Sequence, residues 1–281
     1  MNHILSPHSA YSDCYIDDTA VFSPTWLKHL KHLEAVLKAF LDAGMTLRLS
    51  KCHFGKPQVT FVGHEIGSGM RLPLLNKIEG IMKIEEPKTK KLLKSFLGLC
   101  NYYRGYVNHF AALALPLTEL TKNKYSNVVK FNEEQSLAFV KLKQAICNYT
   151  CLYGARYDRP FIIRTDSSAH SVGAYLGQID DLGVERPLAF ASAKFTEAQR
   201  KWATGQQEAY ALVFALKKFE IFVFGSKIHV FLDHDPLCYI AKCMPQCARL
   251  TRWSLALAKF DLEIKHVRGT QNILADTLSR C

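Results

Sequence analysis

Alternation of apolar and polar residues in the second half of the chain predicts strands separated by turns. The segments PFIIRTD, SVGAYLGQ and RPLAFASA predict three consecutive strands, the last two joined by the turn-prone DDLG. A long helix is then expected from Thr196, a cap with Gln199 three residues on, to about Phe222. Beyond it we expect a strand at KIHVFLD, a helix at RLTRWSLALAKF, a strand at DLEIKHV and a short helix from about Asn272. This order, β-β-β-α-β-α-β-α, predicts an α/β layer fold.

The N-terminal region predicts a hairpin followed by an amphipathic helix. The stretch SDCYIDDTAVFS places two acidic residues between β-prone flanks, so a turn is expected at Asp17-Asp18. The helix has Ser23 as its expected cap, Pro24 in its first turn and Gly44 at its end. Its apolar stripe should face a core and consists of Leu27, Leu30, Val36, Leu37, Phe40 and Leu41.

The middle of the chain is mostly helical in pattern. The segment QVTFVGHEIG predicts a strand that leads into a Gly-rich turn. Residues 76–120 then follow a helical pattern broken by Pro87 and Pro116, and another helix begins at Asn132, which has Gln135 at capping-box spacing. Because the pattern changes near Cys151, we expect a domain boundary near residue 150.

The excess of positive charge is concentrated in the middle third of the chain. Residues 67–150 carry 13 Lys and Arg against 6 Asp and Glu, whereas residues 1–66 are balanced at 6 against 6. The excess centres on Lys83, Lys88, Lys90, Lys91 and Lys94. A solvated helix face and contact with a nucleic-acid backbone both explain such a run. With 48% hydrophobic and 22% charged residues, a globular fold is expected rather than disorder.

Cysteine usage and hydropathy indicate the compartment. Nine cysteines without an obvious framework, and no signal-peptide pattern, predict free thiols in a reducing environment. One run has loose zinc-like spacing but lacks paired Cys-x-x-Cys knuckles, so a zinc site is disfavoured there: His234, Cys238, Cys243 and Cys247. No apolar run approaches the roughly 18 residues that span a bilayer. The expectation is a soluble intracellular protein, cytoplasmic or nuclear, without membrane contact.

Four carboxylates in the second half are the candidate catalytic residues: Asp166, Glu208, Asp233 and Asp276. Three of them lie in or beside apolar runs, where an unpaired charge is unfavourable unless a partner or a metal compensates it. Glu208 shares a helical stripe with Leu212, Ala215 and Phe219, which should point it toward the sheet. For any one acid, satisfaction by arginine or backbone donors is the open alternative. Together, the four favour a site that holds two divalent cations on a phosphodiester.

Two ordered sets of motifs carry a family resemblance. The segments TDSS…GAYL, QEAYALVFALKKFEIFVFG, FLDHDPL and GTQNILADTLSR resemble the RNase H domain of gypsy-class LTR retrotransposon Pol polyproteins. Upstream, YIDD…FS, AGMTLRLSKCHF, FVGHEIG and FLGLCNYYRGYVNHFAALALPLTELTK are similar to the later palm, primer-grip and thumb or connection segments of the same reverse transcriptase. The resemblance implies a truncated palm remnant at 1–66, a thumb/connection-like segment at 67–150 and an RNase H-like mixed sheet flanked by helices at 151–281.

The resemblance also implies roles for individual residues. It makes Asp166, Glu208, Asp233 and Asp276 the ligands of two Mg²⁺ or Mn²⁺ ions that hydrolyse the RNA strand of an RNA–DNA hybrid. His266 precedes Asp276 by ten positions, where the family often has a mobile histidine; an ordinary strand histidine is the open alternative. The lysines at 88, 90, 91 and 94 are expected to bind the hybrid backbone, largely independently of sequence.

Some residues depart from the family pattern. In LDHDPL the family more often has Thr before the first Asp, and Asp235 adds a negative charge before the Pro. Ser167 stands where Ala is usual.

The polymerase half is expected to be incomplete. Tyr15, Asp17 and Asp18 resemble the catalytic hairpin of reverse transcriptases, in which a carboxylate from an earlier strand completes the metal site. The chain starts 14 residues before Tyr15, so this chain alone is expected to lack polymerase activity, and a second chain or a homo-oligomer that completes the palm stays open. RNase H activity is the favoured function. The alternatives are a non-catalytic nucleic-acid-binding module and an inert remnant of a decayed element.

Overall fold

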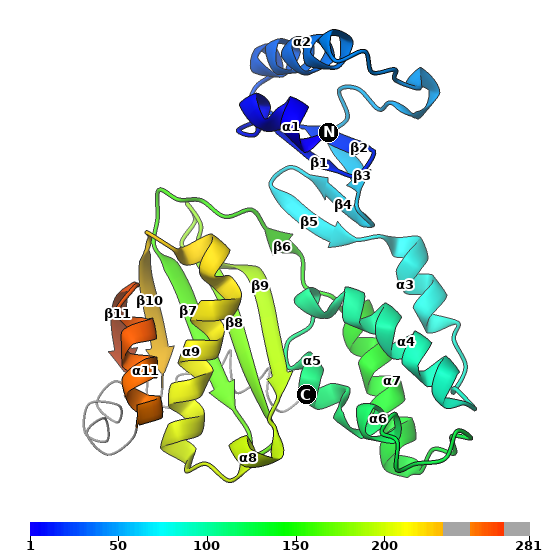
Figure 1. Cartoon of the computed structure of the whole chain (residues 1–281), viewed down its shortest axis with the longest axis vertical. Coiled ribbons are helices and arrows are strands. Elements are labelled where there is room, and N and C mark those ends of the chain that lie inside the picture. Colours follow the sequence, from blue (N-terminus) through cyan, green and yellow to red (C-terminus); the bar gives the residue numbers. More distant parts are fainter. Residues whose placement is uncertain (233–247, 267–281) are drawn as a thin grey trace. The chain divides into compact units, whose positions relative to one another are not determined.

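The computed structural model describes residues 1–232 and 248–266, which divide into two compact units (Figure 1). The first unit comprises residues 1–74 and the second begins at Leu75. Two of the four candidate acids, Asp233 and Asp276, lie outside the described residues, as do the disfavoured zinc run and the expected final helix. Among the residues described, no helix is both long and apolar enough to cross a membrane.

The first unit contains short antiparallel strands and one long helix. Its elements are α1 (Asn2–Leu5), the 3-10 helix η1 (Ser6–His8), β1 (Ser12–Tyr15), β2 (Asp18–Val21), α2 (Trp26–Asp42), the 3-10 helix η2 (Leu49–Lys51), β3 (Gln58–Phe61), β4 (His64–Gly67) and β5 (Met70–Pro73). The expected hairpin is present, but Tyr15 pairs with Asp18, so its turn is Ile16-Asp17 and lies one residue earlier than predicted. Ile16 has φ of 56°, a left-handed conformation suited to a two-residue hairpin turn.

Helix α2 differs from the sequence expectation at its start and along its apolar face. Its cap is Thr25, whose side chain accepts from the backbone N–H of Lys28, whereas Ser23 Oγ instead lies 2.8 Å from His32 Nδ1. The end at Gly44 is confirmed, with φ of 68°. Of the stripe expected to face a core, Val36 and Phe40 are buried, and the rest is at least partly exposed, because the cluster they join is small. Leu27 and Leu41 are 74% and 76% exposed.

The segment predicted as one strand before a turn is a hairpin. Strands β3 and β4 pair antiparallel with Phe61 opposite His64, and β5 continues the meander beside β4. The turn is Val62-Gly63, with φ of 44° and 69°. The prediction was wrong because Val62 is β-prone in sequence yet adopts the left-handed conformation that a two-residue hairpin turn needs.

The second unit begins with a group of helices. They are α3 (Leu75–Met82), α4 (Lys90–Tyr102), the 3-10 helix η3 (Arg104–Tyr106), α5 (Phe110–Leu113), α6 (Leu115–Leu120) and α7 (Glu133–Cys147). The breaks expected near Pro87 and Pro116 are confirmed, and Pro116 lies in the first turn of α6, where its missing N–H is tolerated. The capping box of Asn132 and Gln135 is confirmed at the start of α7. These helices enclose a hydrophobic cluster that also includes Leu152 and Phe190.

The rest of the second unit comprises the short strand β6, which is not part of the main sheet, and a five-stranded mixed sheet with helices on it. Its elements are β6 (Leu152–Tyr153), β7 (Phe161–Ser167), β8 (Ser171–Ile179), β9 (Glu185–Lys194), α8 (Glu197–Arg200), α9 (Thr204–Val223), β10 (Lys227–Leu232), α11 (Ala248–Leu257) and β11 (Asp261–His266). The strand order is β11-β10-β7-β8-β9; β7, β8 and β9 are antiparallel neighbours, and β10 lies parallel to both β7 and β11. The predicted strands and the RNase H-like mixed α/β fold are confirmed.

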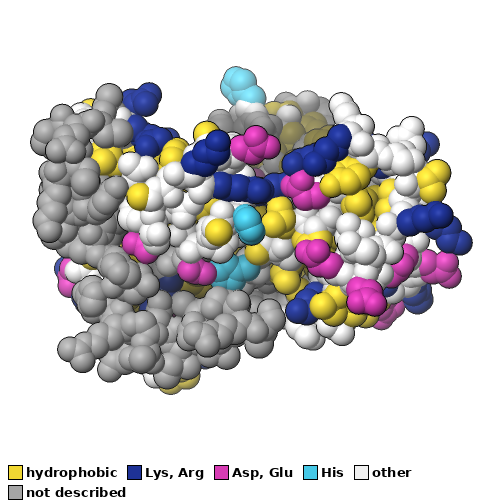
Figure 2. Space-filling model, turned by 90° about the horizontal axis from the view of Figure 1, so that it is seen from below, with side chains coloured by type: hydrophobic (Ala, Val, Ile, Leu, Met, Phe, Trp, Pro, Cys, Tyr) yellow, Lys and Arg dark blue, Asp and Glu magenta, His cyan; other side chains and the backbone are white. Residues whose placement is uncertain are grey.

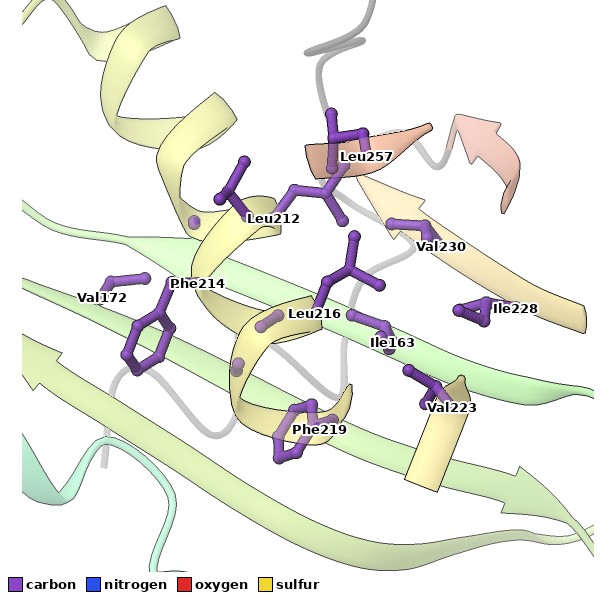
Figure 3. Close-up of a cluster of buried hydrophobic side chains, with 14 of the residues drawn as sticks. Ile163, Val172, Leu212, Phe214, Leu216, Phe219, Val223, Ile228, Val230 and Leu257 are labelled. Atoms are coloured by element: carbon purple, nitrogen blue, oxygen red, sulfur yellow. The ribbon is translucent and has the colours of Figure 1, made fainter. Parts of the chain in front are cut away.

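Helix α9 covers one face of this sheet over β7 and β8 (Figures 1 and 3). Leu212 and Leu216 on the helix and Ile163 on β7 are among its buried contacts. The capping box of Thr196 and Gln199 is confirmed, but it caps only the short helix α8. The single long helix expected from Thr196 is therefore wrong: Ala203 has an extended backbone (φ −61°, ψ 149°) and separates α8 from α9.

Candidate active site

Asp166 lies next to the end of β7, the central strand of the sheet, and its side chain is 45% exposed. Phe161 and Ile163 of the same strand belong to the core beneath α9. Because side chains alternate along a strand, Asp166 lies on the opposite sheet face. The carboxylate is therefore accessible to solvent at a strand end that is held by backbone pairing to β8.

Glu208 lies at the same end of the sheet as Asp166. Strand β9 runs in the same direction as β7, since each is antiparallel to β8, and α9 begins ten residues after β9 ends. Leu212, Ala215 and Phe219 of the expected stripe are buried, while Glu208 itself is half-buried. The topology thus brings two of the four candidate acids to the same end of the sheet, with Glu208 on the helix over one face and Asp166 on the other face.

Two further candidate residues, Asp233 and His266, come at or directly after the last residues of β10 and β11 in the sequence. Strand β10 is parallel to β7, with Phe231 opposite Arg164, and its last residue, Leu232, immediately precedes Asp233. His266 is the last residue of β11 and pairs with Leu232, so its backbone lies at this end of the sheet as well. Among the described residues no three His, Cys, Asp or Glu side chains are grouped to hold a metal ion, and the four-acid site stays a prediction.

A histidine that the sequence did not single out lies beside Asp166. His109 Nε2 is 3.9 Å from Asp166 Oδ2, and 19% of the His109 side chain is exposed. Burial lowers the pKa of His109, and the nearby Asp166 carboxylate opposes this shift without reversing it. The contact joins residues far apart in the chain, so no local pattern could have revealed it.

Two hollows lie on either side of this pair. One, of about 350 Å³, is lined by Ser168 and Ser171 near the β7–β8 turn and by Glu134 and Lys141 of α7. The other, of about 250 Å³, is lined mostly by apolar atoms and includes Tyr175 and Phe190. Asn108, His109 and Asp166 line both. At the end of the molecule seen in Figure 2, histidines lie in the middle with acidic side chains on both sides and Lys and Arg side chains next to them.

An ion pair lines the apolar hollow. Arg164 Nη2 lies 2.8 Å from Glu185 Oε2, and its guanidinium lies 4.6 Å from the centre of the Phe231 ring. Burial raises the pKa of Tyr175 well above its ordinary value, and the adjacent Glu185 carboxylate adds to the shift. Arg164 and Glu185 neutralise each other, so the negative charge that this hollow presents comes from Asp166.

The structure separates the four lysines expected to bind nucleic acid. Lys88, Lys91 and Lys94 are exposed, whereas Lys90 is 9% exposed. Lys90 Nζ donates to the carbonyl oxygens of Lys122 and Tyr125 at 2.7 and 2.5 Å. The expectation for Lys90 is corrected, because its ammonium holds the 122–125 turn and is not presented to a ligand.

The polymerase-like motif is exposed in the first unit. Tyr15 ends β1 with 56% of its surface exposed, and Asp17 and Asp18 are exposed at the hairpin turn. Their catalytic role stays a prediction.

Comparison with known proteins identifies two segments of the chain. Residues 1–66 match a family described as reverse transcriptase (RNA-dependent DNA polymerase), and residues 156–260 match one described as an RNase H-like domain found in reverse transcriptase. The Drosophila melanogaster retrovirus-related Pol polyproteins from transposons opus and gypsy are 32% and 31% identical over 95% of this chain. The chain belongs to the Pol polyproteins of LTR retrotransposons.

Within this family the chain carries a reverse transcriptase region and an RNase H-like domain, and it spans about a quarter of the length of the two Drosophila Pol polyproteins, 27% and 26%. The Transposon Tf2-3 polyprotein of Schizosaccharomyces pombe is 30% identical over 95% of this chain, and the match covers 20% of that polyprotein. Foamy viral protease-reverse transcriptase solved with RNA/DNA hybrid has a TM-score of 0.80 at 24% identity, over 95% of this chain and 37% of that chain. A dRH form solved with double-stranded DNA also reaches 0.80, at 25% identity, over 95% of this chain and 47% of that one.

Proposed function

We propose that the second unit is a ribonuclease H that hydrolyses the RNA strand of RNA–DNA hybrids at the edge where β7 ends. The observation that carries this proposal is the exposed Asp166 carboxylate at the end of the central strand, with Glu208 at the same end of the sheet, inside a domain matched as RNase H-like. Asp233 and Asp276 would complete the site. Domain limits of 1–66, 67–150 and 151–281 are part of the same proposal.

The residues fit a divalent cation with oxygen ligands. Asp166 and Glu208 are carboxylates, the donors that Mg²⁺ prefers and Mn²⁺ accepts. Reverse transcriptase and RNase H families generally use divalent metal ions. Bound there, a pair of such ions would activate a water and stabilise the leaving oxygen of a phosphodiester.

The chain's own residues orient the reaction. Asp166 is fixed by backbone pairing to β8 opposite Gly173, so a ligand at its carboxylate is held relative to the sheet. Glu208 is anchored by the buried stripe of α9. The hydroxyls of Ser168 and Ser171 hydrogen-bond each other, and Ser168 Oγ accepts from the backbone N–H of Ser171, so they stiffen the β7–β8 turn next to Asp166.

A nucleic-acid partner is supported by charge and by relatives. The foamy viral enzymes were solved with RNA/DNA hybrid and with double-stranded DNA, and the basic run of this chain exposes Lys88, Lys91 and Lys94. Lys91 and Lys94 are three residues apart on α4 and share a helix face. We propose that this face contacts the phosphate backbone.

The test of the nuclease is Mg²⁺-dependent cleavage of a labelled RNA–DNA hybrid, which the native chain is expected to perform. Tight hybrid binding without cleavage would favour the non-catalytic binding module instead. If the chain neither binds nor cleaves the hybrid, the inert remnant is the favoured alternative.

The lysine run gives a separate binding prediction. Replacing Lys88, Lys91 and Lys94 together with Gln should weaken hybrid binding and lower the slope of log affinity against log salt by about 2 to 3, since each phosphate contact releases about one counterion. The measurement is fluorescence anisotropy with a labelled hybrid over a series of salt concentrations. An unchanged slope would remove these lysines from the interface.

Lys90 provides the matched control for that experiment. Lys90→Gln should leave the salt slope at the native value, because its ammonium is used by the carbonyls of Lys122 and Tyr125. It should instead lower the melting temperature, since the substitution leaves these carbonyls without their charged donor.

A further inference from the structure

The segment that precedes the RNase H-like sheet is clamped onto it. Arg104 Nη2 donates to the carbonyl oxygen of Ser192 on β9, and the backbone N–H of Ala111 donates to Ser192 Oγ at 3.0 Å. Ser192 is 2% exposed, so both contacts are shielded from water. Residues 104–111 are therefore held on the sheet by hydrogen bonds at two points on either side of His109.

His109 is aimed at the sheet by an uncommon backbone conformation. It adopts φ 49° and ψ 27°, and its N–H donates to Asn108 Oδ1 at 3.0 Å. Its ring lies against Gly173 so closely that a Cβ on this glycine would be 2.7 Å from Nδ1. Gly173 is the strand partner of Asp166, which explains how the imidazole reaches the carboxylate.

We infer that His109 is a positioning residue of the nuclease centre: it orients the Asp166 carboxylate for metal binding, from a segment outside the RNase H-like domain. This inference rests on the proposed function. It assigns no bond-making step to His109, which contacts the carboxylate and not the reacting phosphate.

The geometry suits this role. A carboxylate that ligates a metal with one oxygen leaves the other free for a hydrogen bond, and such outer partners fix its rotamer. His109 Nε2 faces Asp166 Oδ2 at 3.9 Å, so a small rotation of the half-exposed carboxylate brings the pair to hydrogen-bond distance. The carboxylate moves while the imidazole stays, because the His109 side chain is packed against Gly173 and is mostly buried.

Two substitutions at His109 separate the side chain from the backbone. His109→Gly removes the imidazole and keeps the left-handed backbone, which glycine adopts readily. His109→Asn keeps an N–H donor on a residue that tolerates the same conformation. His170→Ala is the matched control: His170 is exposed in the β7–β8 turn, and its described hydrogen bonds use only its backbone.

Metal affinity is the deciding readout, measured on the full chain by calorimetric titration with Mn²⁺ and as the half-saturating Mg²⁺ concentration for hybrid cleavage. His109→Gly should raise the Kd for Mn²⁺ and the half-saturating Mg²⁺ concentration by about tenfold or more, the usual cost of losing an outer partner. The KM for the hybrid should be nearly unchanged. His109→Asn should recover part of the affinity, and His170→Ala should match the native chain. Gly173→Ala, which displaces the ring without altering it, should reproduce the effect of His109→Gly.

The outcomes distinguish this inference from the nuclease itself. If the native chain cleaves, Asp166→Asn loses metal, and His109→Gly binds metal like the native chain, the nuclease stands and the positioning role is overturned. A changed KM for the hybrid at unchanged metal affinity also overturns it, since His109 would then be a substrate contact. If the native chain neither binds metal nor cleaves, the proposed function fails and the inference with it.

Discussion

Replacing Asp166 with Asn should reduce Mg²⁺-dependent cleavage of an RNA–DNA hybrid by about a thousandfold or more. The substitution keeps the shape of the side chain but removes the negative charge that would hold a cation at the end of β7. Loss of several kcal/mol of transition-state stabilisation corresponds to a rate loss of this order, at about 1.4 kcal/mol for each factor of ten. Glu208→Gln should have an effect of the same order, because both carboxylates lie at the same end of the sheet.

The measurement is the single-turnover cleavage rate of a 5′-labelled RNA strand in a hybrid, with single-stranded RNA as the substrate control. Matched variants are Asp261→Asn, an exposed acid at the start of β11, and Glu220→Gln, which lies on α9 beyond the stripe that anchors Glu208. Both controls should cleave at the native rate. Native-like cleavage by Asp166→Asn or Glu208→Gln would remove that residue from the mechanism.

Replacing Leu212 with Ala should lower the free energy of unfolding of the second unit by about 2 to 5 kcal/mol. Leu212 is completely buried between α9 and the sheet, where truncation leaves a cavity that rigid neighbours cannot fill (Figure 3). The loss is a large share of the stability of an ordinary domain, so the variant should unfold at a clearly lower urea concentration.

Fluorescence can follow this unit selectively. Trp202 and Trp253 pack against each other with ring centres 5.5 Å apart in the second unit, while Trp26 lies in the first, so a Trp26→Phe background isolates the signal. Ile221→Ala is the control on the same helix, since Ile221 is 90% exposed and its loss should change the unfolding free energy by less than about 0.5 kcal/mol. Equal effects of the two substitutions would contradict the packing of α9 on the sheet.

Local signals in the sequence predicted much of the fold. The strands β7 to β9 and both capping boxes depend on residues close together in the chain, and each is present. Local reasoning was wrong where one residue's conformation decided the outcome, as at Val62, which turns the chain instead of extending a strand. It also joined α8 and α9 into one helix, because the apolar pattern runs on past Ala203.

The candidate site was less accessible to such reasoning. Asp166 and Glu208 could be proposed from their apolar surroundings, which sequence displays directly. The burial of Lys90 depends on carbonyls of a turn more than thirty residues away, and the approach of His109 to Asp166 spans more than fifty residues. Such contacts are created by tertiary packing and leave no trace in the local pattern.

The strand order of the sheet has a consequence for synthesis of the polypeptide. Strands β7, β8 and β9 pair with their sequence neighbours, so this meander can form soon after it leaves the ribosome. Strand β10 must find β7 across 67 positions, with Phe231 opposite Arg164, and only after α9 has crossed the face between them. Until then β7 has an unpaired edge, and the growing chain depends on rapid docking of α9 to avoid pairing with another nascent copy.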